Sequence, residues 1–173
     1  QRGVDMSAEA KEQLAISLSL AAIKYADLSS DRIKDYVFDW DRMLEPEGNT
    51  GPYLQYAQAR RRSLLRKLAA GETVNAGAIR IQHERERTLA LLLVRFGEAV
   101  ESVAATLEPH KLSSYLYELA SAFASFWADD ACAILREGVA PEMRASRIAL
   151  TDLTGRVLMQ GMALLGVDAP ERM

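Results

Sequence analysis

Apolar residues recur every three or four positions along most of the chain, a spacing typical of α-helices that bury one face. Polar and turn-forming residues separate the apolar stripes from one another. The stripes lie within residues 7–30, 52–70, 79–107, 109–127 and 141–165. The pattern therefore predicts an all-α fold, a helical bundle in which these stripes meet in one core.

Residues 35–51 break the helical pattern. The run Tyr-Val-Phe at residues 36–38 favours a strand but is too short to define one, and residues 40–44 fit a single helical turn. Asp39 and Asp41 flank Trp40, and we interpret them as helix caps rather than as an acid–base pair. We expect the bundle to be entered through this short helical and irregular linker.

Capping and turn residues mark the expected helix ends. Serine at an N-cap, proline in a first turn and glycine just past the last turn are each favoured by the backbone geometry at those positions. We also expect a bend at residues 95–97 that divides the third stripe into two helices. The predicted end markers are Ser7, Pro52, Gly71, Pro109, Pro141 and Gly166.

Composition limits the possible functions. With 173 residues, 49% of them hydrophobic, the chain can bury a core and suits one domain, or one domain with a helical extension. Its net charge of −3 means that any affinity for nucleic acid must come from a local basic patch. No signal peptide and no membrane-spanning apolar run are seen in the sequence.

Cysteine and histidine are too scarce for several kinds of site. The single Cys132 excludes an internal disulfide framework, fits a reducing cytosol, and with only His83 and His110 leaves no predicted metal site. We expect His83, within the charged run at residues 84–87, to be solvated, and His110 to be a surface residue. Phosphate-binding glycine loops and a Ser–His–Asp order are also absent.

The most distinctive stretch is a basic helix that opens with two tyrosines. Tyr53 and Tyr56 precede a cluster of arginine and lysine, and no acidic residue occurs between Gly48 and Gly71. Such a helix suits a polyanion whose bases stack on aromatic rings. Two alternatives remain: an ordinary solvated helix with two core tyrosines, and a helical protein–protein interaction domain that binds an acidic partner.

The order of residues in this stretch resembles arginyl-tRNA synthetase, a class I aminoacyl-tRNA synthetase. The resemblance covers about residues 21–173 and is thin over residues 71–112. It implies that residues 1–50 are the end of the catalytic region with linker helices, and that residues 51–173 are the helical DALR-type anticodon-binding domain. The matching runs are Tyr36-Val-Phe-Asp-Trp-Asp-Arg-Met-Leu44, Gly48-Asn-Thr-Gly-Pro-Tyr-Leu-Gln-Tyr-Ala57, Arg147-Ile-Ala-Leu-Thr-Asp-Leu-Thr-Gly-Arg-Val-Leu158 and Ala169-Pro-Glu-Arg-Met173.

The resemblance also implies which residues contact tRNA. The segment at residues 123–127 matches an aromatic motif of the family but departs from it at Ala124 and Trp127, so stacking rather than polar contact is expected there. Cysteinyl-tRNA synthetase, which has a related helical domain, is a weaker match. The implied anticodon-binding residues are Tyr53, Tyr56, Phe126, Trp127 and Met173, and the implied backbone-binding residues are Arg60, Arg61 and Arg147.

The residues that handle ATP in this family are not found in the chain. Neither a His-Ile-Gly-His-like motif nor a Lys-Met-Ser-Lys-Ser-like loop occurs, and the sequence starts with Gln1 rather than Met. The resemblance implies a full-length cytoplasmic enzyme that joins arginine to tRNA-Arg with ATP and magnesium. We expect this chain to be a monomeric piece of it that carries no catalytic residue and no cofactor.

Overall fold

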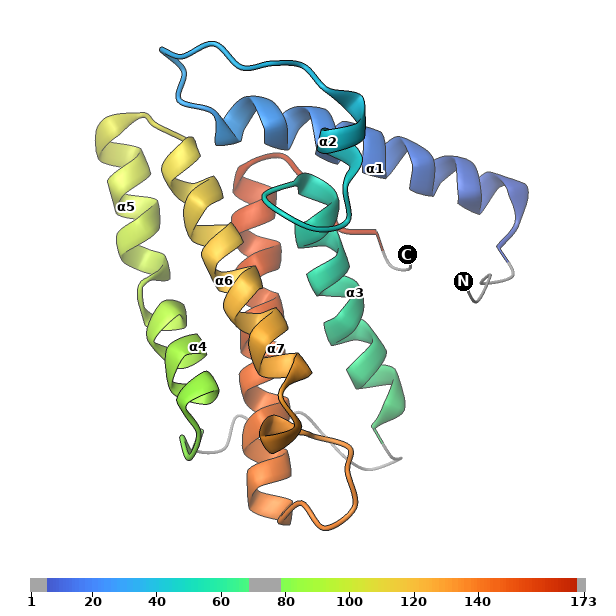
Figure 1. Cartoon of the computed structure of the whole chain (residues 1–173), viewed down its shortest axis with the longest axis vertical. Coiled ribbons are helices and arrows are strands. Elements are labelled where there is room, and N and C mark those ends of the chain that lie inside the picture. The colour runs from blue at the N-terminus through green and yellow to red at the C-terminus, as the bar shows by residue number, and fades with distance from the viewer. Residues whose placement is uncertain (1–5, 69–78, 171–173) are drawn as a thin grey trace.

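Helices account for every regular element in residues 6–68 and 79–170, the parts of the chain that the computed structural model describes (Figure 1). The prediction of an all-α fold is therefore confirmed. None of the helices in these ranges has both the length and the apolar character needed to cross a membrane. The elements are α1 (Ala8–Ser29), α2 (Trp40–Leu44), α3 (Gly51–Lys67), α4 (Glu84–Val94), α5 (Phe96–Thr106), α6 (His110–Ala128), the 3₁₀ turn η1 (Asp130–Cys132) and α7 (Pro141–Leu164).

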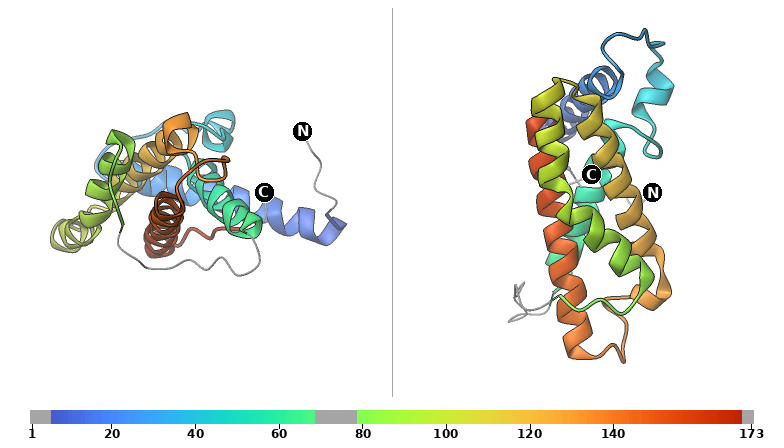
Figure 2. Two further views of the ribbon diagram at one scale, coloured as in Figure 1. Left: turned by 90° about the horizontal axis from the view of Figure 1, so that it is seen from below. Right: turned by 90° about the vertical axis from the view of Figure 1, so that its left-hand side faces the viewer.

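Helix α6 is the centre of the bundle. It packs against α1, α3, α4, α5 and α7, and α7 also packs against α3 and α4. Figures 1 and 2 show α3, α6, α7 and the α4–α5 pair running along the long axis, while α1 crosses one end of them. The N-terminal helix is therefore part of the bundle and is not a detached arm.

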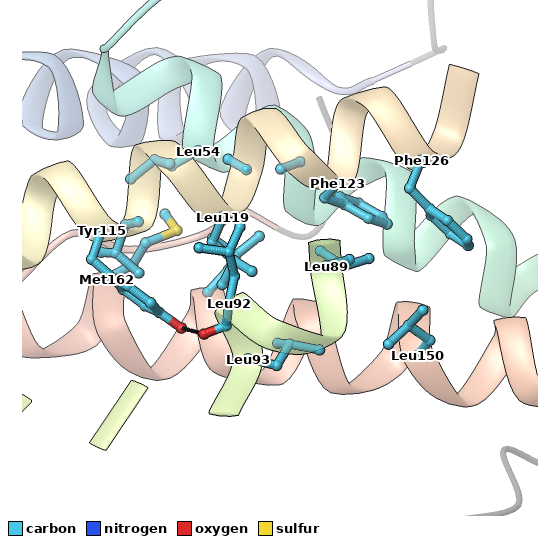
Figure 3. Close-up of a cluster of buried hydrophobic side chains, with 14 of the residues drawn as sticks. Leu54, Leu89, Leu92, Leu93, Tyr115, Leu119, Phe123, Phe126, Leu150 and Met162 are labelled. Atoms are coloured by element: carbon cyan, nitrogen blue, oxygen red, sulfur yellow. Dashed lines mark hydrogen bonds between the residues drawn. The ribbon is translucent and has the colours of Figure 1, made fainter. Parts of the chain in front are cut away.

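The core forms where the apolar stripes of α3, α4, α6 and α7 meet (Figure 3). Burying a leucine or phenylalanine side chain contributes roughly 1.5–3 kcal/mol. Helix α5 is the exception, because none of its residues is fully buried and the following Leu107 is 68% exposed. The predicted buried stripe therefore continues into α5 only as partly buried residues, Phe96, Ala99 and Val103, which pack against the core. Fully buried members of the core are Leu54, Leu64, Leu89, Leu116, Leu119, Phe123, Phe126, Leu150, Leu158 and Met162.

Most predicted helix ends are confirmed. The Ser7 hydroxyl accepts a hydrogen bond from the Ala10 N–H at 3.2 Å, Pro141 opens α7, and Gly166 has a φ of +65°. The bend at Arg95 separates α4 from α5. Pro109 marks the start of α6 as predicted, since it is the N-cap of that helix. The predicted cap Gly71 lies outside the described residues.

The start of α3 lies directly against α1. A Cβ atom on Gly51 would come within 2.3 Å of the Ala21 carbonyl oxygen, so only glycine fits without separating the two helices. Nearby, the buried Tyr25 hydroxyl donates to the Ser113 carbonyl at 2.8 Å and lies 2.7 Å from the Asn49 side-chain oxygen. These contacts fix the direction in which α3 leaves the linker.

Candidate nucleic-acid interface

One side of α3 presents aromatic and basic side chains beside α6. Tyr56 is 43% exposed, and the guanidinium carbon of Arg60 lies 4.7 Å from the centre of its ring. These residues are four apart and therefore share a helix face. The exposed Lys67 follows at a helical spacing that keeps it on the same side. This pairing combines a flat ring with positive charge, as a binding surface for a nucleobase and its phosphate requires.

Tyr53 joins this surface to α6. Its ring is half-buried and lies 5.8 Å, centre to centre, from the ring of Tyr117. Thr50 holds the first turn in place, because its hydroxyl accepts a hydrogen bond from the Tyr53 N–H at 3.2 Å. Tyr117 comes from a distant part of the sequence and was not among the predicted site residues. We call Tyr53, Tyr56, Arg60, Tyr117 and Trp127 the α3–α6 face.

The two aromatic residues predicted at the end of α6 have different positions. Phe126 is fully buried in the core (Figure 3), whereas Trp127 is 36% exposed and packs edge-on against Phe123 with ring centres 5.9 Å apart. Trp127 also borders a cavity of about 160 Å³ lined by Leu64 and residues 132–135. Only Trp127 can therefore offer a ring to a ligand without unfolding the helix.

Two of the three predicted phosphate-binding arginines are held in internal ion pairs. The Arg61 Nε atom lies 2.9 Å from an Asp152 carboxylate oxygen on α7. Arg147 Nε lies 2.7 Å from Glu86, whose side chain is 0% exposed, and Arg147 also donates to the Ala133 carbonyl at 2.9 Å. These arginines link helices, and of the three only Arg60 presents its guanidinium on the α3–α6 face.

The end of the described chain is fastened to α3. Gln55 Nε2 donates to the Asp168 carbonyl at 2.7 Å, and Arg62 donates to the Ala169 carbonyl at 3.2 Å and to that of Pro170. The predicted site residue Met173 lies outside the described residues. The neighbouring residues 168–170 nevertheless lie along the basic helix.

His83 is not solvated as predicted. It is the N-cap of α4, its Nδ1 atom accepts from the Arg85 N–H at 3.2 Å, and the same atom lies 3.2 Å from Cys132 Sγ. Glu86 completes the capping box by accepting from the backbone N–H groups of Gln82 and His83. The charged run therefore caps a helix and links it to η1.

The same cluster contains a possible metal-ligand set that composition did not predict. Donor atoms of His83, Asp129 and Cys132 all lie within 4.8 Å of one another. Backbone hydrogen bonds already engage two of them, since Asp129 Oδ1 accepts from the Ala131 N–H at 2.9 Å and His83 Nδ1 accepts from Arg85. Because these hydrogen bonds cap α4 and η1, helix capping alone accounts for the positions of the His83 and Asp129 side chains. Asp129 and Cys132 belong to the turn at η1, whereas His83 is the N-cap of α4, far away in the sequence, which is why sequence spacing gave no signal.

Burial should make Cys132 unreactive. Burial, with a contribution from the nearby Glu86, raises the pKa of its thiol to about 11. Iodoacetamide reacts with the thiolate and not with the thiol. A pKa raised by about two units lowers the fraction of Cys132 present as thiolate about 100-fold. We expect iodoacetamide at pH 8 to modify the folded protein at least about 100-fold more slowly than the urea-unfolded protein. Equal rates, followed by mass spectrometry, would show that the thiol is open to solvent.

Comparison with known proteins gives a consistent family assignment. The model for the DALR anticodon binding domain matches residues 54–173, and the model for the class I (R) tRNA synthetase catalytic domain matches residues 2–40. The arginine–tRNA ligase of Cutibacterium acnes is 50% identical over 181 residues, which cover 98% of this chain and 32% of that protein. The Alteromonas mediterranea ligase is 43% identical over 173 residues, covering 100% of this chain and 30% of that protein.

Solved structures agree. Arginyl-tRNA synthetase from Thermus thermophilus superposes with a TM-score of 0.81 at 35% identity, over 98% of this chain and 28% of that one. The Plasmodium falciparum enzyme gives a TM-score of 0.81 at 32% identity, and the superposition covers 93% of this chain and 28% of that one. The chain thus spans about 30% of the length of its Alteromonas relative. Since the first family model matches most of its residues, this chain belongs to the DALR anticodon binding domain family.

Proposed function

We propose that this chain is the anticodon-binding module of an arginyl-tRNA synthetase. Residues 51–173 would form the RNA-binding bundle, and residues 1–50 the end of the catalytic region with its linker helices. The observation that carries the proposal is the exposed Tyr56 ring with Arg60 over it, on a basic helix of a DALR-type domain. An anticodon loop offers unstacked bases and phosphates together, which are the groups that such a pair recognises.

Within the α3–α6 face, the exposed rings of Tyr56 and Trp127 are the proposed stacking surfaces. Tyr53 and Tyr117 are half-buried and would form the wall beside them. Phe126 would support Trp127 from the core rather than touch a base. We keep Met173 in the proposed site on the family resemblance alone, because residues 168–170 contact Gln55 and Arg62, on a different side of α3 from Tyr56.

Phosphate contacts are assigned to Arg60 and to the exposed Arg66 and Lys67. Such contacts add salt-dependent affinity and little sequence information. Arg61 and Arg147 are removed from this set, because their guanidinium groups already pair with Asp152 and Glu86. Using either one for phosphate would leave an unpaired carboxylate inside the bundle.

For the whole enzyme we propose the activity named for the relatives, the joining of arginine to tRNA-Arg with ATP and magnesium, in a cytoplasmic monomer. The motifs that handle ATP in this family do not occur in residues 1–173. The module alone should therefore bind tRNA without forming arginyl-adenylate.

A helical protein–protein interaction domain remains the alternative, and a titration with total tRNA over a salt series distinguishes the two. Binding through phosphates weakens steeply as salt rises. Absence of binding at low salt would favour the interaction domain.

Replacing Tyr56 by Ala should weaken binding to tRNA-Arg by about 1–3 kcal/mol, the usual contribution of base–aromatic stacking. The loss should be smaller for tRNA-Arg whose anticodon nucleotides lack their bases, because the ring contacts a base and not a phosphate. The melting temperature should fall less than for truncation of a core ring, since Tyr56 is 43% exposed. Tyr36→Ala is the matched control, because Tyr36 is also 43% exposed but lies in the linker. Equal losses for both tRNAs would remove Tyr56 from the anticodon site.

A further inference from the structure

Three side chains of metal-ligating type meet at one end of the bundle, between the start of α4 and the turn η1 (Figure 1). The donor atoms of His83, Asp129 and Cys132 all lie within 4.8 Å of one another, and His83 Nδ1 lies 3.2 Å from Cys132 Sγ. Ligand atoms that share one tetrahedral zinc ion, at about 2.0–2.3 Å from the metal, lie within about 4 Å of one another. Small side-chain movements would therefore bring these three donors around one ion. We call the three residues the α4–η1 cluster.

Helix capping accounts for two members of the cluster but gives the Cys132 thiol no satisfactory partner. The thiol is buried, and its one hydrogen-bond contact within the described ranges is His83 Nδ1. That nitrogen already accepts from the Arg85 N–H at 3.2 Å. Because an imidazole nitrogen has a single lone pair, it cannot accept fully from both the N–H and the S–H. Loss of the thiol proton to solvent would convert this poorly bonded group into a metal ligand.

The surrounding groups hold the cluster in a form that an ion can use. Asp129 Oδ1 accepts from the Ala131 N–H at 2.9 Å, which leaves Oδ2 free of backbone hydrogen bonds. Outer hydrogen bonds of this kind orient the ligating side chains of metal sites. The long ion pair of Oδ2, 3.8 Å from Arg85 Nε, is no obstacle, because the Arg85 side chain is 54% exposed and can turn toward water. Asp129 can therefore cap η1 and bind a metal at the same time.

We propose that the α4–η1 cluster binds one zinc ion through the His83 imidazole, the Cys132 thiolate and Asp129 Oδ2. Imidazole, thiolate and carboxylate are the ligand types that zinc takes in proteins, and three protein ligands with a water are typical of an open zinc site. His83 and Asp129 are only partly buried, so water can reach the fourth position. The thiol releases its proton to solvent as the ion binds, and one thiolate with one carboxylate neutralises the charge of Zn²⁺. The ion joins the first turn of α4 to η1.

Cobalt absorption and zinc calorimetry on the untagged chain, freed of metal with EDTA, test the proposal. Cobalt(II) takes zinc sites and gives a near-ultraviolet charge-transfer band when a thiolate binds it. We expect one cobalt ion per chain, a thiolate band that zinc abolishes, and a melting temperature that rises with zinc concentration, because the ion binds the folded chain. A missing thiolate band would overturn the proposal, and so would zinc that binds only by joining two chains into a dimer.

Variants that keep the caps separate metal binding from folding. His83→Asn removes the imidazole but retains a favoured N-cap residue. This variant and Cys132→Ala should each lower zinc affinity by more than the roughly 10–100-fold that loss of an outer hydrogen-bond partner costs. His110→Asn, at the other histidine of the chain, is the matched control and should bind zinc as the wild type does. Unchanged affinity in His83→Asn would overturn the proposal even if Cys132→Ala fails to fold.

The zinc proposal stands apart from RNA binding. None of the three ligands belongs to the α3–α6 face, so His83→Asn should leave the affinity for tRNA-Arg unchanged in EDTA. Loss of zinc binding with tRNA binding intact, and the reverse, are therefore distinguishable results.

Discussion

Replacing Arg147 by Ala is expected to lower the free energy of unfolding by about 3–5 kcal/mol, the usual cost of breaking a buried ion pair by removing one partner. Glu86, left behind, is 0% exposed and has no route to water. The other carboxylate oxygen of Glu86 accepts hydrogen bonds from the backbone N–H groups of Gln82 and His83. The carboxylate therefore cannot move away without uncapping α4. Arg147 also donates a hydrogen bond to the Ala133 carbonyl, so its removal should make the loop after η1 more mobile.

Urea unfolding of Arg147→Ala and Arg156→Ala measures this effect. Arg156 is an exposed arginine on the same helix, so its removal should change stability by less than about 0.5 kcal/mol. The pair of variants also separates the two roles considered for Arg147. An unchanged stability together with a weaker salt dependence of tRNA binding would show that Arg147 contacts phosphate and that the ion pair is dispensable.

Gly51→Ala is the second substitution with a large expected effect, a loss of about 3 kcal/mol or more in the free energy of unfolding. The added Cβ would lie 2.3 Å from the Ala21 carbonyl oxygen and 2.6 Å from its carbon, both backbone atoms of α1. Backbone in the middle of a helix cannot rotate aside as a side chain can. Helix α3 would have to shift away from α1, and the Tyr25–Asn49 contact would shift with it.

The control is Gly97→Ala, because nothing lies within 4 Å of a Cβ built there. Gly97 is in α5, and alanine in an open helical position should stabilise the protein by up to about 1 kcal/mol. The two glycine variants should therefore change the urea midpoint in opposite directions. A Gly51→Ala protein as stable as the wild type would show that the contact between α1 and α3 relaxes at little cost.

Local signals in the sequence predicted much of the fold. Ser7, Pro141 and Gly166 each act through the backbone of their own turn, and their predicted positions are confirmed. The sequence was less informative about which residue at the end of α6 faces the core, since Phe126 and Trp127 both continue the spacing of the α6 core residues. The structure buries Phe126, and the sequence alone could not decide how far the helix is rotated.

The candidate site was predictable only in part. Tyr56 and Arg60 are four residues apart on one helix, and their pairing follows from helical geometry. The ion pairs of Arg61 and Arg147 join residues 91 and 61 positions apart, so no local pattern indicated that these cations are neutralised. Tyr117 was missed for the same reason. The order of residues in the resemblance, rather than charge or spacing, is what indicated an RNA-binding domain.

Binding to an isolated anticodon stem–loop tests the central claim most directly. The dissociation constant of this chain is measured for a stem–loop that carries an arginine anticodon and for the same stem–loop with those three bases replaced. Base contacts on the α3–α6 face predict at least about fivefold tighter binding to the arginine anticodon, since the contacts to one base contribute roughly 1–3 kcal/mol. Equal dissociation constants for the two stem–loops would contradict the account, because contacts that do not depend on base identity would then explain the binding.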